Sequence, residues 1–105
     1  MIDPDIRDNA DAKRYELAIG DNMAVVTYNL SEPNLMITET LVPQALEGQG
    51  VASRLAKHVI ADAQARGLLI LPVCTFFAGY FQKHPELADA VHPTYRQILG
   101  LASKS

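Results

Sequence analysis

A short segment near the middle of the chain has the composition of an anion-binding loop. Two glycines spaced two residues apart lack a Cβ, so the backbone can approach a bound anion closely. If a helix follows, its first amides are unpaired donors at a partly positive end, and a pyrophosphate could bind without nearby lysine or arginine. A plain strand-to-helix turn is the alternative. The segment comprises Glu47, Gly48, Gln49, Gly50, Val51 and Ala52.

Two common nucleotide-binding fingerprints do not fit this loop. The spacing Gly-x-Gly-x-x-Gly fails because Ser53 occupies the third glycine position, and no Gly-Lys-Ser/Thr follows. The formal net charge is -3 and the sequence contains no run of Lys or Arg, which argues against nucleic acid or an anionic membrane as a partner. A phosphate ligand would therefore have to be held by local backbone geometry.

Three antiparallel strands are expected ahead of the loop. Apolar residues alternate over 14–19, β-branched and aromatic residues fill 23–30, and a third apolar run covers 35–42. Turn-forming residues separate these runs, as they do in consecutive hairpins. Pro43 ends the third strand, because proline has no backbone donor with which to continue the hydrogen-bond ladder.

A helix from about Gly50 to Arg66 and a strand over 68–74 are expected after the loop. Gly67 provides a stop for the helix, and the strand is almost wholly apolar, as expected for a strand covered on both faces. In such a βαβ unit the ligand crevice lies at the carboxyl ends of the strands, here after Val42 and Cys74. The apolar positions at helical spacing are Val51, Leu55, Val59 and Ala63.

The last third of the chain is expected to be mainly helical. Thr75 can cap a helix over 76–83, and Pro85 can open a second short helix. For the tail, 92–101, the pattern leaves a last edge strand and a short helix both open.

These elements predict one α/β (α+β) domain over residues 1–105, with a mixed sheet of antiparallel N-terminal strands followed by the βαβ unit. The first dozen residues, rich in Asp, are expected to be loosely ordered and outside the core. The single cysteine and the lack of Cys/His spacing predict no metal site. A polar start, and no apolar stretch near the roughly 18 residues of a membrane span, predict a cytoplasmic protein without a membrane partner.

Four segments in this order resemble the GNAT N-acetyltransferase superfamily, and most closely its compact single-domain branch, called YjdJ-like. The acetyl-CoA loop of the superfamily reads Arg/Gln-x-x-Gly-x-Gly/Ala, which the chain matches at Gly50 and Ala52 while carrying Glu47 at the first position. The resemblance extends from about Thr38 to about Pro93. The matching segments are Leu41-Val42-Pro43, residues 46–55, Leu71-Pro72-Val73-Cys74 and Lys83-His84-Pro85-Glu86.

The resemblance implies a GNAT-like sheet that splays into a cofactor crevice between the strands ending near Val42 and Cys74. The pantetheine arm of CoA would pair with the backbone of Leu41 and Val42, and the acetyl thioester would point toward Cys74 and Glu39. The implied activity is transfer of acetyl from acetyl-CoA to an amine of a small molecule or a protein. Because the short chain leaves the acceptor site open, a second subunit could complete it, and a homodimer is one expectation.

Cys74 and Glu39 are the candidate catalytic residues. Cys74 could protonate the leaving thiolate or accept the acetyl group as a nucleophile, and its alternative is a buried core cysteine. Glu39 could remove a proton from the amine if burial raised its pKa, and its alternative is an exposed strand carboxylate. The YjdJ-like branch has His-Thr-Glu-Val-Pro ahead of the loop, and here Glu39 and Leu41 replace the His and the Glu.

Aromatic residues after Cys74 form a further candidate group. Most should lie in the core, but Phe77 and Phe81, at helical spacing, could form an apolar wall beside pantetheine. The Tyr80 hydroxyl could donate a proton to the thiolate. His84 could face the cofactor or mark the helix boundary before Pro85.

Three functions remain in competition on the sequence. The first is an acetyl-CoA-dependent N-acetyltransferase. The second is a CoA-binding module with little or no catalysis, and the third is a small α/β interaction protein with an ordinary glycine turn. Binding of CoA separates the third from the others, and turnover that depends on an acceptor amine separates the first from the second.

Overall fold

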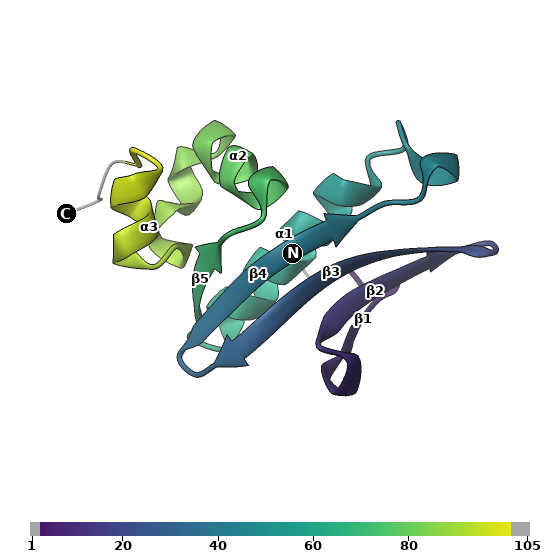
Figure 1. The fold of residues 1–105 in the computed structure, drawn as a ribbon, viewed down its shortest axis with the longest axis horizontal. Helices are drawn as coiled ribbons and strands as arrows, with labels where there is room; N and C mark the ends of the chain where they lie inside the picture. Colours follow the sequence, from purple (N-terminus) through teal and green to yellow (C-terminus); the bar gives the residue numbers. More distant parts are fainter. Residues whose placement is uncertain (1–2, 102–105) are drawn as a thin grey trace.

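Five strands form one sheet in the order β1-β2-β3-β4-β5 (Figure 1). The computed structural model describes residues 3–101. The first four strands pair antiparallel and β5 pairs parallel with β4, which confirms the predicted mixed α/β sheet. The strands are β1 (Ile6–Asn9), β2 (Arg14–Ile19), β3 (Asn22–Ser31), β4 (Asn34–Leu41) and β5 (Leu69–Pro72).

Helices pack against one face of this sheet. In Figure 1 α1 lies behind the strands, while α2 and α3 gather beside β5. Residues of α1 and α2 line one common pocket, so these two helices lie side by side. The helices are α1 (Val51–Ala65), α2 (Thr75–Lys83) and α3 (Pro93–Ile98), with short 3-10 turns η1 (Ala10–Ala12), η2 (Gln44–Leu46) and η3 (Pro85–Ala90).

The apolar spacing predicted for α1 is confirmed, because all four positions of the expected stripe are buried. The helix begins after Gly50 and ends before Gly67, and both glycines have a positive φ. Of the two possibilities left open for the tail, the short helix α3 forms, while Val91 makes a single isolated parallel bridge to Ile70.

The last strand is shorter and less covered than its sequence suggested. The prediction of a strand over 68–74 buried on both faces is wrong, because β5 spans only Leu69–Pro72 and its residues alternate between half-buried and buried. Ile70 and Pro72 face the core, whereas Leu69 and Leu71 lie on the other face. Within residues 3–101, the helices that pack on the sheet lie on the Ile70 side, so the opposite side of β5 keeps solvent contact.

Residues 3–12 include a paired strand and contribute one residue, Ile6, to the core, whereas the first dozen residues were expected to be loosely ordered and outside it. Within the described part of this segment, β1 pairs with β2 and Ile6 is buried at 7% exposure. The Asp3 amide donates to Nδ1 of His58 at 2.9 Å, and Arg54 donates to the Asp3 carboxylate at 3.0 and 3.2 Å. These partners lie about fifty residues away, which is why local composition did not reveal them. Residues 1–2 lie outside the described part.

A bulge in β4 changes which residues face the core. Thr27 of β3 pairs with Glu39 and the next residue, Tyr28, pairs with Ile37, so Thr38 is an extra residue between the two pairs. Directly paired residues share a face of the sheet. Thr40, which pairs with the fully buried Val26, therefore lies on the core face, while Glu39 lies on the opposite face.

Candidate active site

The glycine loop adopts a backbone that requires glycine. Gly48 has φ +80° and Gly50 has φ +72°, both in the left-handed region. A Cβ added at either position would meet no described atom within 4 Å, so it is the backbone conformation, rather than crowding, that selects glycine. Gly50 is the N-cap residue of α1, and the first hydrogen bond of the helix runs from the Arg54 amide to the Gly50 carbonyl at 3.0 Å. The preceding amides of α1 are therefore free to bind an anion.

The loop surrounds a pocket of about 270 Å³. Five predicted loop residues and Val42 line it, together with Leu46 and Ser53, which sequence reasoning missed. Gln49 does not line it, because its side-chain amide turns back and donates to the Ala45 carbonyl at 3.3 Å. The lining residues are Val42, Leu46, Glu47, Gly48, Gly50, Val51, Ala52 and Ser53.

A second hollow of about 400 Å³ lies at the end of β4. The two share Val42, and the second also contains Leu41, as the sequence predicted for the pantetheine path. Its other lining residues, which carried no sequence signal, are Met23, Thr40 and Pro43. The two pockets therefore lie next to each other, one at the start of α1 and one at the carboxyl end of β4.

The sheet parts beside this path. The last pair between β4 and β5 is Ile37 with Pro72, and the Cys74 amide then donates to the Ile37 carbonyl at 2.9 Å. Beyond this point β4 continues to Leu41 while the chain after β5 turns into α2. The two strands therefore diverge directly after Ile37, at the place where the sequence predicted a cofactor crevice.

Cys74 lies at this opening. It is 7% exposed, belongs to the core cluster and is the N-cap residue of α2. Its Sγ lies 3.3 Å from Oγ1 of Thr40. Sequence reasoning missed Thr40, because simple alternation along β4 would have turned it away from the core; only the bulge brings it to Cys74.

Glu39 and Cys74 are not brought together. Glu39 is exposed and lies on the face opposite Thr40, as the bulge dictates, whereas Cys74 is on the core side. The prediction that a thioester would point toward both side chains is therefore wrong, because Glu39 and Cys74 lie on opposite faces of β4.

The aromatic wall predicted for pantetheine is not formed by Phe77 and Phe81. Both side chains are fully buried, at 0% exposure, because their face of α2 packs into the core. Phe76 is the exposed phenylalanine of this helix. Tyr80 faces α1 instead, and burial, with a smaller effect of the Glu86 charge, raises the pKa of its hydroxyl.

His84 lies at the boundary between α2 and η3, as its position before Pro85 indicated. Its ring is 4.3 Å from the Tyr80 ring, and its Nδ1 lies 3.4 Å from Oε2 of Glu86. Neither pocket of the loop path includes it. Its contacts therefore support the structural reading of this residue.

Across residues 3–101 the fold does not gather three His, Cys, Asp or Glu side chains into a possible metal site. In the same part of the chain, no helix is long and apolar enough to cross a membrane.

The sequence model of one protein family, described as GCN5-related N-acetyl-transferase, matches residues 14–90. The chain belongs to this family. The match spans β2 to the end of η3, and so includes the glycine loop, the β4–β5 opening and Cys74. Membership in the GCN5-related N-acetyltransferases supports an acyltransferase activity. The assignment to the YjdJ-like branch stays a prediction, and a search of curated proteins finds no match.

Proposed function

We propose that this GCN5-related N-acetyltransferase transfers acetyl from acetyl-CoA to an amine. The observation that carries the proposal is the pair of hollows at the glycine loop and at the end of β4, which share Val42 and lie near the point where β4 and β5 part. The loop offers backbone donors to a pyrophosphate, and the Cys74 thiol and the Thr40 hydroxyl lie together beyond the last β4–β5 pair. A long ligand with phosphates at one part and a reactive group at the other fits this arrangement.

The loop would hold the pyrophosphate mainly through backbone donors. The first amides of α1 are unpaired and point out of its N-terminus, where the helix dipole favours negative charge. The two left-handed glycines leave open space above the loop. Glu47 is exposed, so its side chain can turn into solvent, away from a bound phosphate.

The reaction needs two proton transfers, and the chain's own thiol can serve one of them. Bound acetyl-CoA would supply the activated acetyl group, and the amine nitrogen must lose a proton as its bond to the carbonyl carbon forms. Solvent water can take this proton. Glu39 and Cys74 flank β4 from opposite faces, so a thioester beside the Cys74 sulfur does not also face the Glu39 carboxylate. The sulfur that leaves when the C–S bond breaks must gain a proton. We assign this step to the Cys74 thiol, whose sulfur contacts the Thr40 hydroxyl.

Calorimetric titration with acetyl-CoA and with CoA tests the binding half of the proposal. In Gly50→Glu, a side chain and a negative charge enter the open space at the start of α1, so binding should weaken by at least about tenfold. Gly20→Glu is the matched control: Gly20 also has a positive φ, +59°, and lies in the β2–β3 turn. Both variants carry a similar backbone strain of about 1–2 kcal/mol.

The outcomes separate the competing functions. Tight binding by the wild type and by Gly20→Glu, with loss in Gly50→Glu, supports the loop. If the wild type binds no CoA species, the acetyltransferase proposal fails and an interaction protein becomes the better explanation. If CoA binds but a panel of amines produces no acceptor-dependent release of CoA thiol, the chain is a CoA-binding module.

A further inference from the structure

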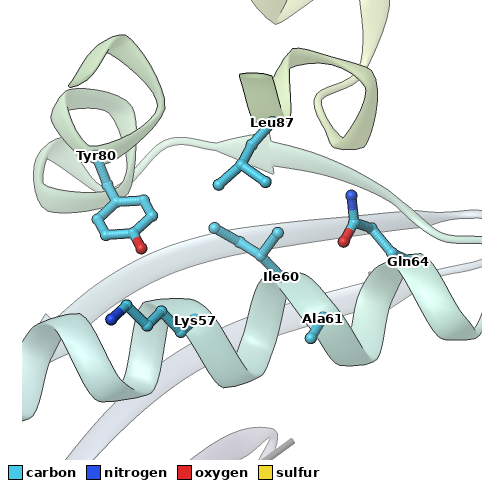
Figure 2. Close-up of a pocket in the computed structure, with 6 residues that line it drawn as sticks. All are labelled: Lys57, Ile60, Ala61, Gln64, Tyr80 and Leu87. Atoms are coloured by element: carbon cyan, nitrogen blue, oxygen red, sulfur yellow. The ribbon is translucent and has the colours of Figure 1, made fainter. Parts of the chain in front are cut away.

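The two faces of the sheet differ in what covers them. The helices that pack on the sheet within residues 3–101 lie on the face that holds Val26 and Ile37. Figure 2 shows side chains of these helical segments meeting each other, with Ile60 of α1 and Leu87 of η3 on two sides of a pocket that Lys57 borders. We call the opposite side of the sheet, which these helices leave to solvent, the open face.

Groups of opposite charge lie in one row across the middle of the open face. Arg14 of β2 pairs with Thr27 of β3, and Thr27 pairs with Glu39 of β4. Directly paired residues share a face of the sheet, so the three side chains lie together on the face opposite the core. The row therefore carries a cation on one side of β3 and an anion on the other side.

Both charges of this row are accessible to a partner. The Arg14 side chain is 39% exposed, and its Nε donates to Glu16 at 2.6 Å, which holds the guanidinium on the open face. Glu39 is exposed, and its carboxylate forms no ion pair within residues 3–101. Within one copy the backbones of Arg14 and Glu39 are two strand spacings apart, about 10 Å, and the two side chains do not pair.

Apolar side chains flank the charged row at both of its sides. Val25 and Leu41, which pair with each other across β3 and β4, lie on one side. Met36 and Leu71, which pair across β4 and β5, lie on the other. Leu41 and Met36 are exposed, so covering them would remove apolar surface from water.

A two-fold axis that runs along β3 makes the open face complementary to itself. Such an axis places β2 of one copy opposite β4 of the other, at the same height along the strands, and places β3 opposite β3. Arg14 then faces Glu39 of the second copy, Glu39 faces Arg14 of the second copy, and the two Thr27 residues meet at the axis. Sheets that pack face to face lie about 10 Å apart with nearly aligned strands, a gap that these long side chains can bridge.

We propose that the open face is the interface of a homodimer, in which the two sheets pack together and Arg14 and Glu39 form two symmetric ion pairs. From the usual strand spacing and rise, the face covers roughly 500 Å² per copy. Because a stable interface takes about 800 Å² per partner, we expect a weak dimer with a Kd on the order of 10 µM. The inference goes beyond the proposed function and does not depend on CoA binding.

Sedimentation equilibrium at protein concentrations on both sides of about 10 µM tests the interface. The wild type should pass from monomer to dimer across this range. Glu39→Arg should raise the Kd for dimer formation by at least about tenfold, because both ion pairs become pairs of like charges. Asp89→Arg is the matched control: it changes the net charge by the same amount at an exposed position of η3, and should dimerise like the wild type.

Cross-linking tests the position of the axis independently. In Thr27→Cys the two new thiols face each other between sheets about 10 Å apart, so a short bismaleimide should join the two copies. Thr94→Cys, exposed on α3, is the matched control and should remain without a cross-link. Both variants keep the buried Cys74, so the control also measures any reaction of that thiol. Unfolding followed by circular dichroism checks that each variant keeps its fold.

The outcomes decide the inference. A concentration-dependent dimer that Glu39→Arg weakens and that cross-links through Thr27→Cys supports it. A wild type that stays monomeric at the highest concentration overturns it, because the open face then does not bind a second copy. A dimer that Glu39→Arg leaves intact, or that Thr27→Cys fails to cross-link, overturns it as well, because the copies then meet on another surface.

Discussion

At the scale of single residues, the contact between Thr40 and Cys74 gives the buried thiol a defined neighbour at the opening of the sheet. Their Oγ1 and Sγ atoms are 3.3 Å apart. A core cysteine needs no such partner, since thiols pack well as small apolar groups. If Cys74 supplies a proton during transfer, the Thr40 hydroxyl positions the sulfur for that step.

Removing either group should affect turnover more than binding. Cys74→Ala should lower kcat by at least about tenfold, a modest loss for a general acid, with little change in the Kd for acetyl-CoA. Thr40→Val keeps the shape of the side chain but removes the hydroxyl. It should lower kcat by about fivefold, because losing one hydrogen bond costs about 1 kcal/mol. Steady-state kinetics and calorimetry measure the two quantities.

Thr40→Ser is the matched control, because it restores the hydroxyl and should recover most of the rate. If Cys74→Ala turns over like the wild type, the thiol is a structural core residue and the proton must come from another donor.

At the scale of elements, two tyrosines tie the sheet to the first strand and to α1. The Tyr15 hydroxyl of β2 donates to Asp62 of α1 at 2.7 Å, and the Tyr28 hydroxyl of β3 donates to Asp8 of β1. Arg66 contacts both carboxylates, at 3.5 Å for Asp8 and 3.2 Å for Asp62. Burial, followed by the hydrogen bond to the neighbouring carboxylate, raises the pKa of both phenols.

This network should make the fold sensitive to alkali. The folded state keeps both phenols protonated, so their contribution is fully present below the unfolded pKa of about 10 and is lost as the pH rises above it. Tyr15→Phe and Tyr28→Phe should each lower the free energy of unfolding by about 1 kcal/mol at neutral pH and make its fall above pH about 10 shallower. Urea unfolding at a series of pH values measures both effects.

Tyr95→Phe, outside these hydrogen bonds, should retain the steep alkaline fall of the wild type. An equally steep fall in the Tyr15→Phe and Tyr28→Phe variants would show that other groups govern the alkaline transition.

At the scale of the whole molecule, the proposed ligand contacts two layers of the fold, the sheet and the helices that pack on one of its faces. The loop pocket belongs to the start of α1 and the opening belongs to β4 and β5, so a bound ligand would join the α1 layer to the sheet. Binding should therefore stabilise the fold as a unit.

Acetyl-CoA at a hundred times its Kd should raise the free energy of unfolding by about 2.7 kcal/mol. For a domain of this size that corresponds to a rise in Tm of roughly 10 °C or more. Thermal unfolding with and without ligand measures the shift. Gly50→Glu should lose it and Gly20→Glu should keep it; a shift of equal size in both would place the ligand away from the loop.

The sequence by itself determined the features whose causes are local. Gly48 and Gly50 adopt a left-handed backbone that other residues rarely adopt, so these two glycines were enough to predict the loop. The extent of α1 followed from its apolar spacing and its flanking glycines, and the end of β4 followed from Pro43. Each of these depends on a few neighbouring residues, and the order of segments was enough to indicate the family.

Only the tertiary structure decided which side chains meet. The bulge at Thr38 depends on the register between β3 and β4. Because of it, Thr40 faces the core and Glu39 faces away, the reverse of what simple alternation along β4 predicts. Phe77 enters the core because of where α2 packs, and Lys57 borders a pocket because α2 and η3 lie against α1. Such contacts join residues far apart in the chain, and their free energies depend on partners that no local window contains.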